Sequence, residues 1–510
     1  MRTLEPDARA YRSAWAVLAL AVLARLSAAA LVPLAPDETY YWEWSRHLAA
    51  GYLDHPPVIA WLIRLGTALF RATPFGVRIG SVLAGVLASI IVARSARVLG
   101  GDRAMLRAAA IIACMPLAQI GLGLATPDAP LMLFWSLAVA ALIAALRPDV
   151  DSRARLAAWG LAGLSLGTAL SSKYTALLLL ASTGIALLAI PSLRRHLATP
   201  GPYVALAATL AVFAPNLIWN AEHGWSAFAY QLSHGLAVHR GSALTHELAL
   251  AGGQIALVSP LLLAALAIPA ARAMRDRDDD VRTTLAMIAV VTWLAFVITA
   301  LRSAVEPNWQ APAYLSAIIL AATYHGAPRF TRLLRAGCAL GAAFTLLIYA
   351  HALVPFVPTS IALDPTASGF GWDTLAAHVD TLRHTEPTQS WIAGERYQEA
   401  SELAFHLHDH PQTFVIDVHA RPTQYDLWPQ FSSEAHTGDR LILVLGLSTR
   451  AEDDPVIAVL IPHFTHVVLH DTVALRRGTT IRAMRRIWIL DGWRGTWPGV
   501  SPRASTAVLR

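Results

Sequence analysis

The chain has 510 residues, of which 55% are hydrophobic and only 15% charged, and its formal net charge is +6. Soluble domains average about 25% charged residues, so the composition excludes a wholly soluble protein and predicts a polytopic membrane protein with a soluble part. Both cysteines, Cys114 and Cys338, lie in apolar runs, which excludes a disulfide framework and a cysteine-based metal site.

The first apolar run covers residues 14–34 and follows Arg9 and Arg12. It is longer than the roughly 7–15 residues of a signal-peptide core, so we interpret it as an uncleaved spanning helix. A spanning helix needs about 20 mostly apolar residues. On this criterion the sequence predicts about eleven spans, at 14–34, 76–98, 105–123, 128–146, 156–171, 174–191, 203–220, 247–269, 283–301, 309–325 and 335–354.

The segment 58–71 is apolar but short, and it carries Arg64 and Arg71. We therefore predict an amphipathic helix that lies in the membrane interface. If it spans instead, the topology after it inverts. With the N-terminus in the cytoplasm, one set of loops holds most arginines and the opposite set holds few, which agrees with the positive-inside rule. The arginine-rich set contains Arg94, Arg97, Arg103, Arg107, Arg147, Arg153, Arg155, Arg194, Arg195, Arg272, Arg275, Arg277, Arg282, Arg329, Arg332 and Arg335.

Residues from about 358 onward differ in character from the rest of the chain. Charged residues and histidines become frequent, and alternating apolar runs such as "TFVIDV", "RLILVLGL", "THVVLH" and "IRAMRRIWIL" indicate strands of a small α/β domain. We therefore expect a membrane domain over 1–357, whose first outer loop (35–75) contains interfacial helices, and a soluble outer domain over 358–510.

The unusual polar motifs all fall on the predicted outer side. They are "PDETYYWEW" with Asp37 and Glu38, "DHPP" with His55, "ATPDAPL" with Asp128, "SSKYT" with Lys173, and "VEPNW" with Glu306. Each has an ordinary structural explanation: a solvated acid pair, an aromatic belt at the interface, or an acid that complements a helix dipole. Their occurrence together on short outer turns favours one functional cavity instead.

Arg25 lies inside the first predicted span, where an unpaired charge costs at least about 2.5–3.5 kcal/mol. Two explanations stay open. The side chain snorkels or pairs within the helix bundle, or it lines a polar cavity that opens toward Asp37.

In these motifs, taken in order and together with "EPNWQAPAYL", "RYQEASELAFHL" and "RPTQYDLWPQF", the chain resembles the polyprenyl-phosphate-sugar-dependent glycosyltransferases of the GT-C class. The nearest group is that of the aminoarabinose transferases and protein mannosyltransferase-like enzymes. The resemblance implies a GT-C fold in the bacterial inner membrane, with the active site and the C-terminal domain facing the periplasm. It also implies inverting sugar transfer from undecaprenyl phosphate to lipid A, core oligosaccharide or protein. Membrane lipids are expected partners and nucleic acid is not.

The resemblance also implies roles for individual residues. Asp37 would be the catalytic carboxylate that takes or orients the acceptor proton, with Asp128 and Glu38 as further acids. A cation would stabilise the leaving lipid phosphate, and the candidates are Lys173, Arg78 and Arg25. Substrate contacts are expected from Tyr40, Trp42, His55, Tyr174, Glu306 and Asn308. A divalent metal is left open, because Glu38, His55 and His223 are suitable ligands in outer loops although their spacing matches no metal motif.

Three other classes of protein compete with this interpretation. A polyprenyl-lipid transporter would often show internal repeats, broken helices and charges at the bilayer midplane, whereas here the acids cluster at one face and no repeat is visible. A lipid-linked oligosaccharide ligase or polymerase would rely on arginines and a histidine in a large outer loop. A membrane-anchored binding protein would act through the C-terminal domain alone, and replacement of Asp37 by Asn would then have little effect.

Overall fold

The computed structural model describes residues 6–236, 241–356, 364–385, 388–416, 422–447 and 454–497. The chain divides into two compact units. We call residues 1–31, 55–222 and 231–350 the membrane unit, and residues 32–54, 223–230 and 351–510 the C-terminal unit. The predicted domain boundary at residues 357 and 358 lies outside the described residues and stays a prediction.

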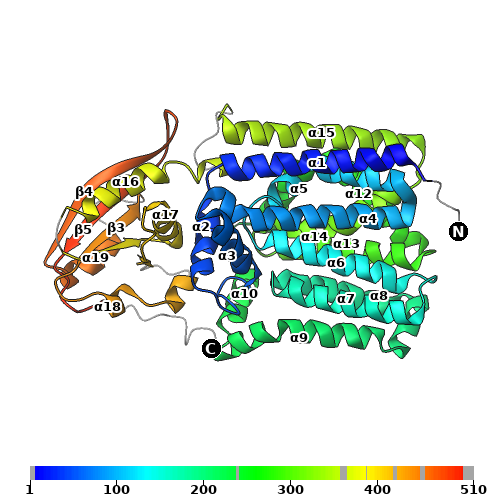
Figure 1. The fold of residues 1–510 in the computed structure, drawn as a ribbon, viewed down its shortest axis with the longest axis horizontal. Coiled ribbons are helices and arrows are strands. Elements are labelled where there is room, and N and C mark those ends of the chain that lie inside the picture. Colours follow the sequence, from blue (N-terminus) through cyan, green and yellow to red (C-terminus); the bar gives the residue numbers. More distant parts are fainter. Residues whose placement is uncertain are drawn as a thin grey trace. The chain divides into compact units, whose positions relative to one another are not determined.

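The membrane unit is built from helices (Figure 1). They are α1 (Ala8–Leu31), α3 (Val58–Phe70), α4 (Pro74–Cys114), α5 (Pro116–Gly121), α6 (Asp128–Leu146), α7 (Ser152–Leu170), η1 (Tyr174–Ala176), α8 (Leu177–Ala189), η2 (Pro191–Ala198), α9 (Gly201–Glu222), α11 (Ala243–Val258), α12 (Pro260–Asp276), α13 (Asp280–Ala300), η3 (Pro307–Gln310), α14 (Ala311–Thr323) and most of α15 (Pro328–Leu353). Helix α10 (Ser226–Leu236) has residues assigned to both units.

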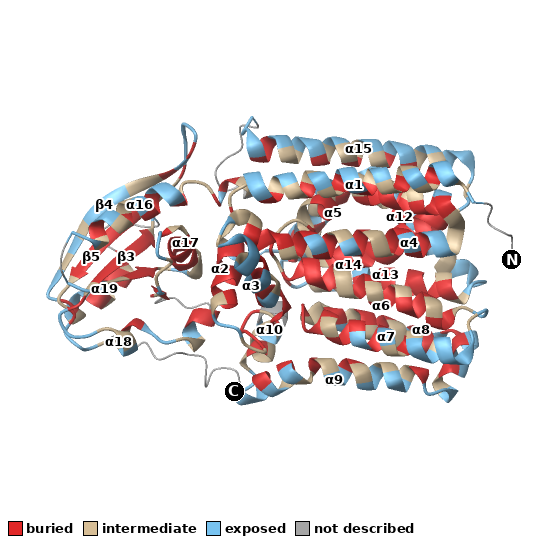
Figure 2. Ribbon diagram, viewed as in Figure 1, coloured by how far each residue is buried: buried red, intermediate tan, exposed pale blue. Residues whose placement is uncertain are grey.

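Neighbouring helices of this unit pack in sequence: α1 on α4, α4 on α6, α6 on α7 and α7 on α9. The helices at the edge of the bundle expose large apolar side chains, including Leu23 of α1, Leu210 of α9 and Leu346 of α15, as the pale colours in Figure 2 show. Exposed apolar surface of this extent marks contact with lipid. The described residues contain six helices that are long and apolar enough to cross a membrane, or eight if each of two bent pairs is one span. The count of eleven therefore stays a prediction.

Two predicted spans are interrupted where the sequence was expected to be continuous, and a third is followed by a bend. The predicted helix 247–269 is interrupted at Ser259, where a φ of 78° begins a bend of 97° between α11 and α12. The predicted helix 105–123 is interrupted at Met115, and the predicted helix 174–191 is followed from Ile190 by a bend of 105° into η2. Each of these three residues precedes a proline, whose ring disfavours helical backbone in the residue before it.

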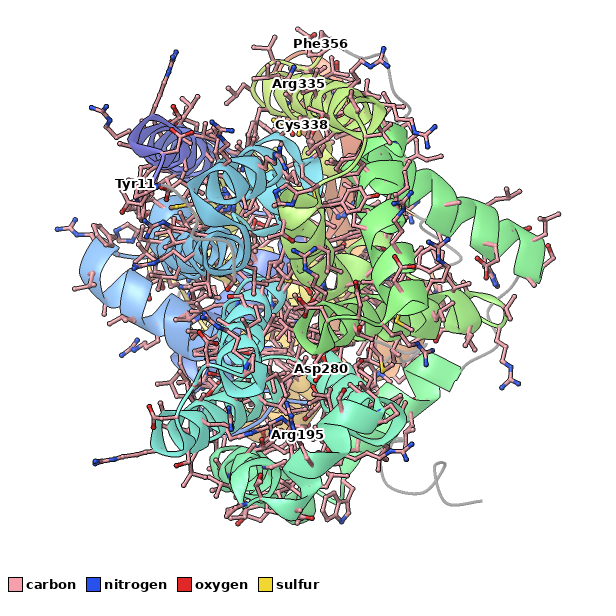
Figure 3. The ribbon with its side chains drawn as sticks, turned by 90° about the vertical axis from the view of Figure 1, so that its right-hand side faces the viewer. Tyr11, Arg195, Asp280, Arg335, Cys338 and Phe356 are labelled. Atoms are coloured by element: carbon pink, nitrogen blue, oxygen red, sulfur yellow. The ribbon has the colours of Figure 1, made fainter. Side chains whose placement is uncertain are left out.

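The segment predicted to lie in the interface forms α3, a helix of 13 residues. Its length is about 20 Å, which is too short to cross a hydrocarbon core of about 30 Å. Arginines gather at one end of the bundle, where Arg97 pairs with Asp102, Arg147 with Asp149 and Arg282 with Asp279. Figure 3 looks onto this end and labels Tyr11, Arg195, Asp280 and Arg335 there.

The C-terminal unit is an α/β structure with one sheet of five strands in the order β2-β1-β3-β5-β4. Strands β1, β2 and β3 are parallel, and β5 is antiparallel to β3 and β4. Its elements are α2 (Pro36–Arg46), η5 (Pro365–Ala367), α16 (Trp372–Arg383), β1 (Ser390–Gly394), α17 (Tyr397–His406), β2 (Thr413–Val415), η6 (Gln424–Leu427), α18 (Phe431–Glu434), β3 (Arg440–Gly446), α19 (Pro455–Leu460), η8 (Ile461–His463), β4 (His466–Arg477) and β5 (Thr480–Asp491).

All four predicted strand segments contain strands, and β1 was missed. Both faces of the sheet are covered, which the central strand β3 makes clear. Leu441 and Leu443 belong to the core on one face, whereas Ile442 and Val444 belong to the core on the other. A strand buried on both faces is a nearly continuous apolar run, as "RLILVLG" is.

We expect the close packing of α7 against α9 to depend on Gly163. A Cβ atom there would lie 2.1 Å from the carbonyl oxygen of Ala205, whereas a Cβ atom at Gly160, one turn earlier, meets only ordinary van der Waals contact. Overpacking of this kind costs about 1–3 kcal/mol. Gly163→Ala should lower the thermal unfolding midpoint in detergent by several degrees, while Gly160→Ala should not lower it. Equal midpoints for the two variants would contradict this packing.

Candidate functional site

Three turns of the membrane unit meet at Asp128, the first residue of α6. One carboxylate oxygen of Asp128 accepts a hydrogen bond from the ammonium of Lys173 at 2.7 Å. The other oxygen accepts one from the side-chain amide of Asn308 at 2.9 Å. Asp128 and Lys173 are both buried. The structure therefore brings together three of the predicted site residues, and it shows that Lys173 is already paired with an acid.

The remaining predicted site residues of this unit lie in different settings. Tyr174 donates a hydrogen bond to Asn216 at 3.2 Å. His55 is half-buried and Arg78 is buried near the start of α4. Glu306 is exposed at the start of η3, so its neighbour Asn308 supplies the contact with Asp128.

Arg25 does not snorkel, because its side chain is buried inside the bundle with 1% exposure. One guanidinium nitrogen donates a hydrogen bond to the hydroxyl of Ser89 on α4 at 3.2 Å. The other two nitrogens have no hydrogen-bond partner among the described residues. A buried cation with donors left over is a candidate for binding an anionic group.

Asp37 and Glu38 lie in the first turn of α2, in the C-terminal unit, and they differ in solvent exposure. Glu38 is buried, and its carboxylate accepts a hydrogen bond from the backbone N–H of Ala35 at 2.9 Å, which satisfies one of the free donors at the helix start. Asp37 is the only exposed residue of α2, all of which the structure describes. One oxygen of Asp37 accepts a hydrogen bond from the hydroxyl of Tyr397 at 2.8 Å.

The aromatic residues of "PDETYYWEW" do not form an interfacial belt, because they are buried within the C-terminal unit. Tyr40 donates a hydrogen bond to Asp54 at 2.7 Å and accepts one from the backbone of Gln424 at 2.6 Å. Trp42 has 3% exposure and packs edge-on against Phe405. This burial favours a packing role for Tyr40 and Trp42 over direct contact with a sugar.

Sequence reasoning missed the residues that hold α2 in place. They lie in two motifs of the C-terminal region that contribute to the family resemblance. That resemblance is the sequence feature that could have pointed to these residues. From "RYQEASELAFHL", Tyr397 contacts Asp37, and Ser401 shares a hydrogen bond with Thr39 at 3.0 Å. From "RPTQYDLWPQF", the side chain of Gln424 accepts a hydrogen bond from the backbone of Leu53 at 2.8 Å.

Two buried acids lie on the helices that form this packing. Burial raises the pKa of Glu43 on α2 and of Glu402 on α17 to about 7, because desolvation outweighs the opposing effects of Arg46 on Glu43 and of His406 on Glu402. Arg46 pairs with Glu43 at 2.6 Å, and a ring nitrogen of His406 lies 3.2 Å from Glu402. Glu38 and Glu399 also raise the pKa of Glu402 by charge repulsion.

The described residues contain no group of three His, Cys, Asp or Glu side chains arranged to hold a metal ion. The possible metal set of Glu38, His55 and His223 is thus without geometric support, and we carry no metal into the proposals below.

The chain is similar to known glycosyltransferases in sequence and in fold. Residues 54–219 match the family model described as dolichyl-phosphate-mannose-protein mannosyltransferase. The lipid A galacturonosyltransferase RgtD of Rhizobium johnstonii is 27% identical over 56% of this chain and 59% of its own length. The undecaprenyl phosphate-α-4-amino-4-deoxy-L-arabinose arabinosyl transferase of Pseudomonas paraeruginosa is 37% identical over 28% of this chain and 29% of its own. The chain thus spans less than two thirds of the length of either relative.

Solved structures match over more of the chain. ArnT from Cupriavidus metallidurans bound to undecaprenyl phosphate is 16% identical, with a TM-score of 0.64 over 93% of this chain and 97% of that protein. The archaeal oligosaccharyltransferase AglB from Archaeoglobus fulgidus is 13% identical, with a TM-score of 0.53 over 85% of this chain. The chain therefore has the GT-C fold, with a small C-terminal sheet domain. Its predicted resemblance to glycosyltransferases that use lipid-linked sugars is confirmed.

Breaking the buried pair of Asp128 and Lys173 should destabilise the membrane unit. Lys173→Met leaves a buried carboxylate without its cation, which costs roughly 3–5 kcal/mol in comparable buried pairs. The double variant Asp128→Asn/Lys173→Met removes both charges and should unfold at a higher temperature than Lys173→Met alone. Thermal unfolding in detergent measures both midpoints. Additive effects of the two substitutions would contradict a direct pair.

We expect Glu402 to make stability depend on pH. Burial raises the pKa of its carboxyl to about 7 in the folded chain, from an ordinary value of 4.5. Between these values the unfolded chain has lost a proton that the folded chain keeps, so stability falls as pH rises through this window and levels off above it. Glu402→Gln should therefore reduce the fall in unfolding midpoint between pH 5 and pH 8. An unchanged fall would mean that Glu402 is already ionised in the folded chain.

Proposed function

We propose that this chain is an integral membrane glycosyltransferase that moves a sugar from an undecaprenyl-phosphate-linked donor onto lipid A. The names of the relatives support the two substrate classes, since one acts on lipid A and the other uses an undecaprenyl phosphate sugar. The sugar would be a galacturonosyl or a 4-amino-4-deoxy-L-arabinosyl group. The arginine-rich end of the bundle supports a cytoplasmic placement of that end and, with it, a reaction on the periplasmic side of the inner membrane.

The observation that carries the proposal is the exposed carboxylate of Asp37 on an otherwise buried helix. A carboxylate that takes a proton from a substrate must be accessible, and the exposure of Asp37 supports this role. In an inverting transfer the acceptor oxygen bonds to the anomeric carbon while the bond from that carbon to the lipid phosphate breaks. Asp37 would receive the proton of an acceptor hydroxyl, a contribution of roughly 10²–10⁴-fold. If the acceptor is a phosphate, Asp37 would orient it instead.

The leaving lipid phosphate gains negative charge during the transfer and needs a cation. Two groups in the membrane unit support this role. Arg25 has two guanidinium nitrogens without a partner among the described residues, about 9 Å before the end of α1. Lys173 donates to Asp128, yet an ammonium has three donors, so the pair can fix Lys173 in position and leave two N–H groups for a phosphate. Arg78 stays a third candidate.

The other predicted residues take supporting roles in this proposal. Asn308 completes the hydrogen bonding of Asp128, and Tyr174 joins the turn of Lys173 to α9. Glu38 stabilises the start of the helix that presents Asp37. His55 and Glu306 are kept as candidate substrate contacts.

Replacement of Asp37 tests the proposal directly. Purified protein is incubated with lipid A and, in separate reactions, with the aminoarabinosyl or galacturonosyl donor on undecaprenyl phosphate. Mass spectrometry follows the mass of lipid A and the release of undecaprenyl phosphate. Asp37→Asn should lower the rate by roughly 10²–10⁴-fold because the carboxylate no longer accepts or directs the proton.

Asp149→Asn is the matched control, since Asp149 is an exposed carboxylate in the arginine-rich end of the bundle and should keep full activity. Unchanged transfer by Asp37→Asn would overturn the proposal. In cells, deletion of the gene should remove one sugar from lipid A.

A further inference from the structure

Among the described residues, the carboxylate of Asp37 accepts a hydrogen bond from a residue far away in the sequence. The hydroxyl of Tyr397, the first residue of α17, donates to one of its oxygens at 2.8 Å. Tyr397 lies 360 residues further along the chain, in the region that the sequence suggested only as a separate soluble domain. Asp37 itself is exposed at the start of α2, so its carboxylate is accessible to an acceptor group.

The ring of Tyr397 is held by a stack of buried aromatic residues. Its centroid lies 4.3 Å from that of Tyr40. Tyr40 is itself fixed at its hydroxyl by two hydrogen bonds, one to Asp54 and one from the backbone of Gln424. Tyr425 lies on Tyr40 as well, with ring centroids 6.0 Å apart and planes 12° apart. The hydroxyl that contacts Asp37 therefore sits on a side chain with little freedom to move.

The topology of the sheet gives Tyr397 its place. Strand β1 ends at Gly394, and the chain continues through α17 to β2 on one side, whereas β3 lies on the other side of β1. The carboxyl ends of β1 and β3 thus form a switch point, the position at which open α/β sheets bind their ligands. At this switch point the side chain of Glu395, which follows β1, accepts a hydrogen bond from the backbone N–H of Gly446 at the end of β3, at 3.2 Å.

We infer that Tyr397 is a positioning residue for the transfer reaction: its hydroxyl fixes one oxygen of the Asp37 carboxylate so that the other points at the acceptor. This inference rests on the proposed function of Asp37. An exposed aspartate at a helix start otherwise rotates between several side-chain conformers, and only a fraction of them direct an oxygen correctly. Misplacement of a reacting group by about 1 Å can cost roughly 100-fold in rate.

Tyr397→Phe keeps the ring and its stacking on Tyr40 but removes the hydroxyl. We expect kcat to fall by roughly 10- to 100-fold, with little change in KM for the undecaprenyl phosphate donor and a nearly unchanged unfolding midpoint. The donor is whichever of the aminoarabinosyl and galacturonosyl lipids the wild-type protein uses. A merely structural role would lower the midpoint and the amount of folded protein without this separation of kcat from KM.

Tyr425→Phe is the matched control. It removes a hydroxyl from the same aromatic stack, and the hydrogen bond to Asp37 comes from Tyr397 and not from this hydroxyl. It should therefore retain activity within about twofold. Tyr397→Ala, which also removes the ring, should lose at least as much kcat as Tyr397→Phe and lower the midpoint too.

The outcomes separate this inference from the proposed function. If Asp37→Asn is inactive and Tyr397→Phe is fully active, the positioning role is wrong and the proposed function stands. If Asp37→Asn is active, both fail. If Tyr397→Phe and Tyr425→Phe lose the same activity, the stack contributes only to folding and the positioning role is again wrong.

Discussion

The proposed site depends on one packing constraint, the burial of α2 by α17 in the C-terminal unit. A helix of 11 residues is marginal in water on its own, so its position must come from tertiary contacts. Eight of its residues are buried, and Thr39, Tyr40 and Trp42 each contact a residue beyond position 396. Asp37 is the exception, exposed at the helix start beside Tyr397. The chain thus holds the exposed Asp37 in place by burying eight other residues of α2.

The membrane unit follows a second rule, that a buried charge must be partnered. Asp128 obeys it fully, because a cation and an amide occupy its two oxygens. This arrangement also ties together three turns that are far apart in sequence. Arg25 departs from the rule, since Ser89 satisfies only one of its three nitrogens among the described residues. Most buried polar groups in native proteins are satisfied, so the two unpartnered nitrogens of Arg25 make it a candidate for binding an anionic ligand.

Sequence reasoning succeeded where a pattern has one physical cause. The apolar runs located the membrane helices, and alternation located four of the five strands. It failed where two causes compete. Hydropathy joined residues 247–269 into one helix, although Ser259 precedes a proline and is driven out of helical backbone. The short outer turns predicted that Asp128 and Lys173 would lie close together, which the structure shows. The burial of α2 by residues near 400 could not be predicted, because local sequence patterns carry no information about packing partners so distant in the chain.

This last failure bears on how the C-terminal unit should be understood. Taken alone, a sheet at the end of a membrane protein suggests a separate module, and its removal would leave the membrane part intact. The contacts argue otherwise, because residues 32–54 belong to this unit and the sheet places Tyr397 at its switch point. In most α/β domains that point receives a ligand. Here Tyr397, which follows β1, donates a hydrogen bond to Asp37 at the start of α2, so the C-terminal unit contributes a residue to the proposed site.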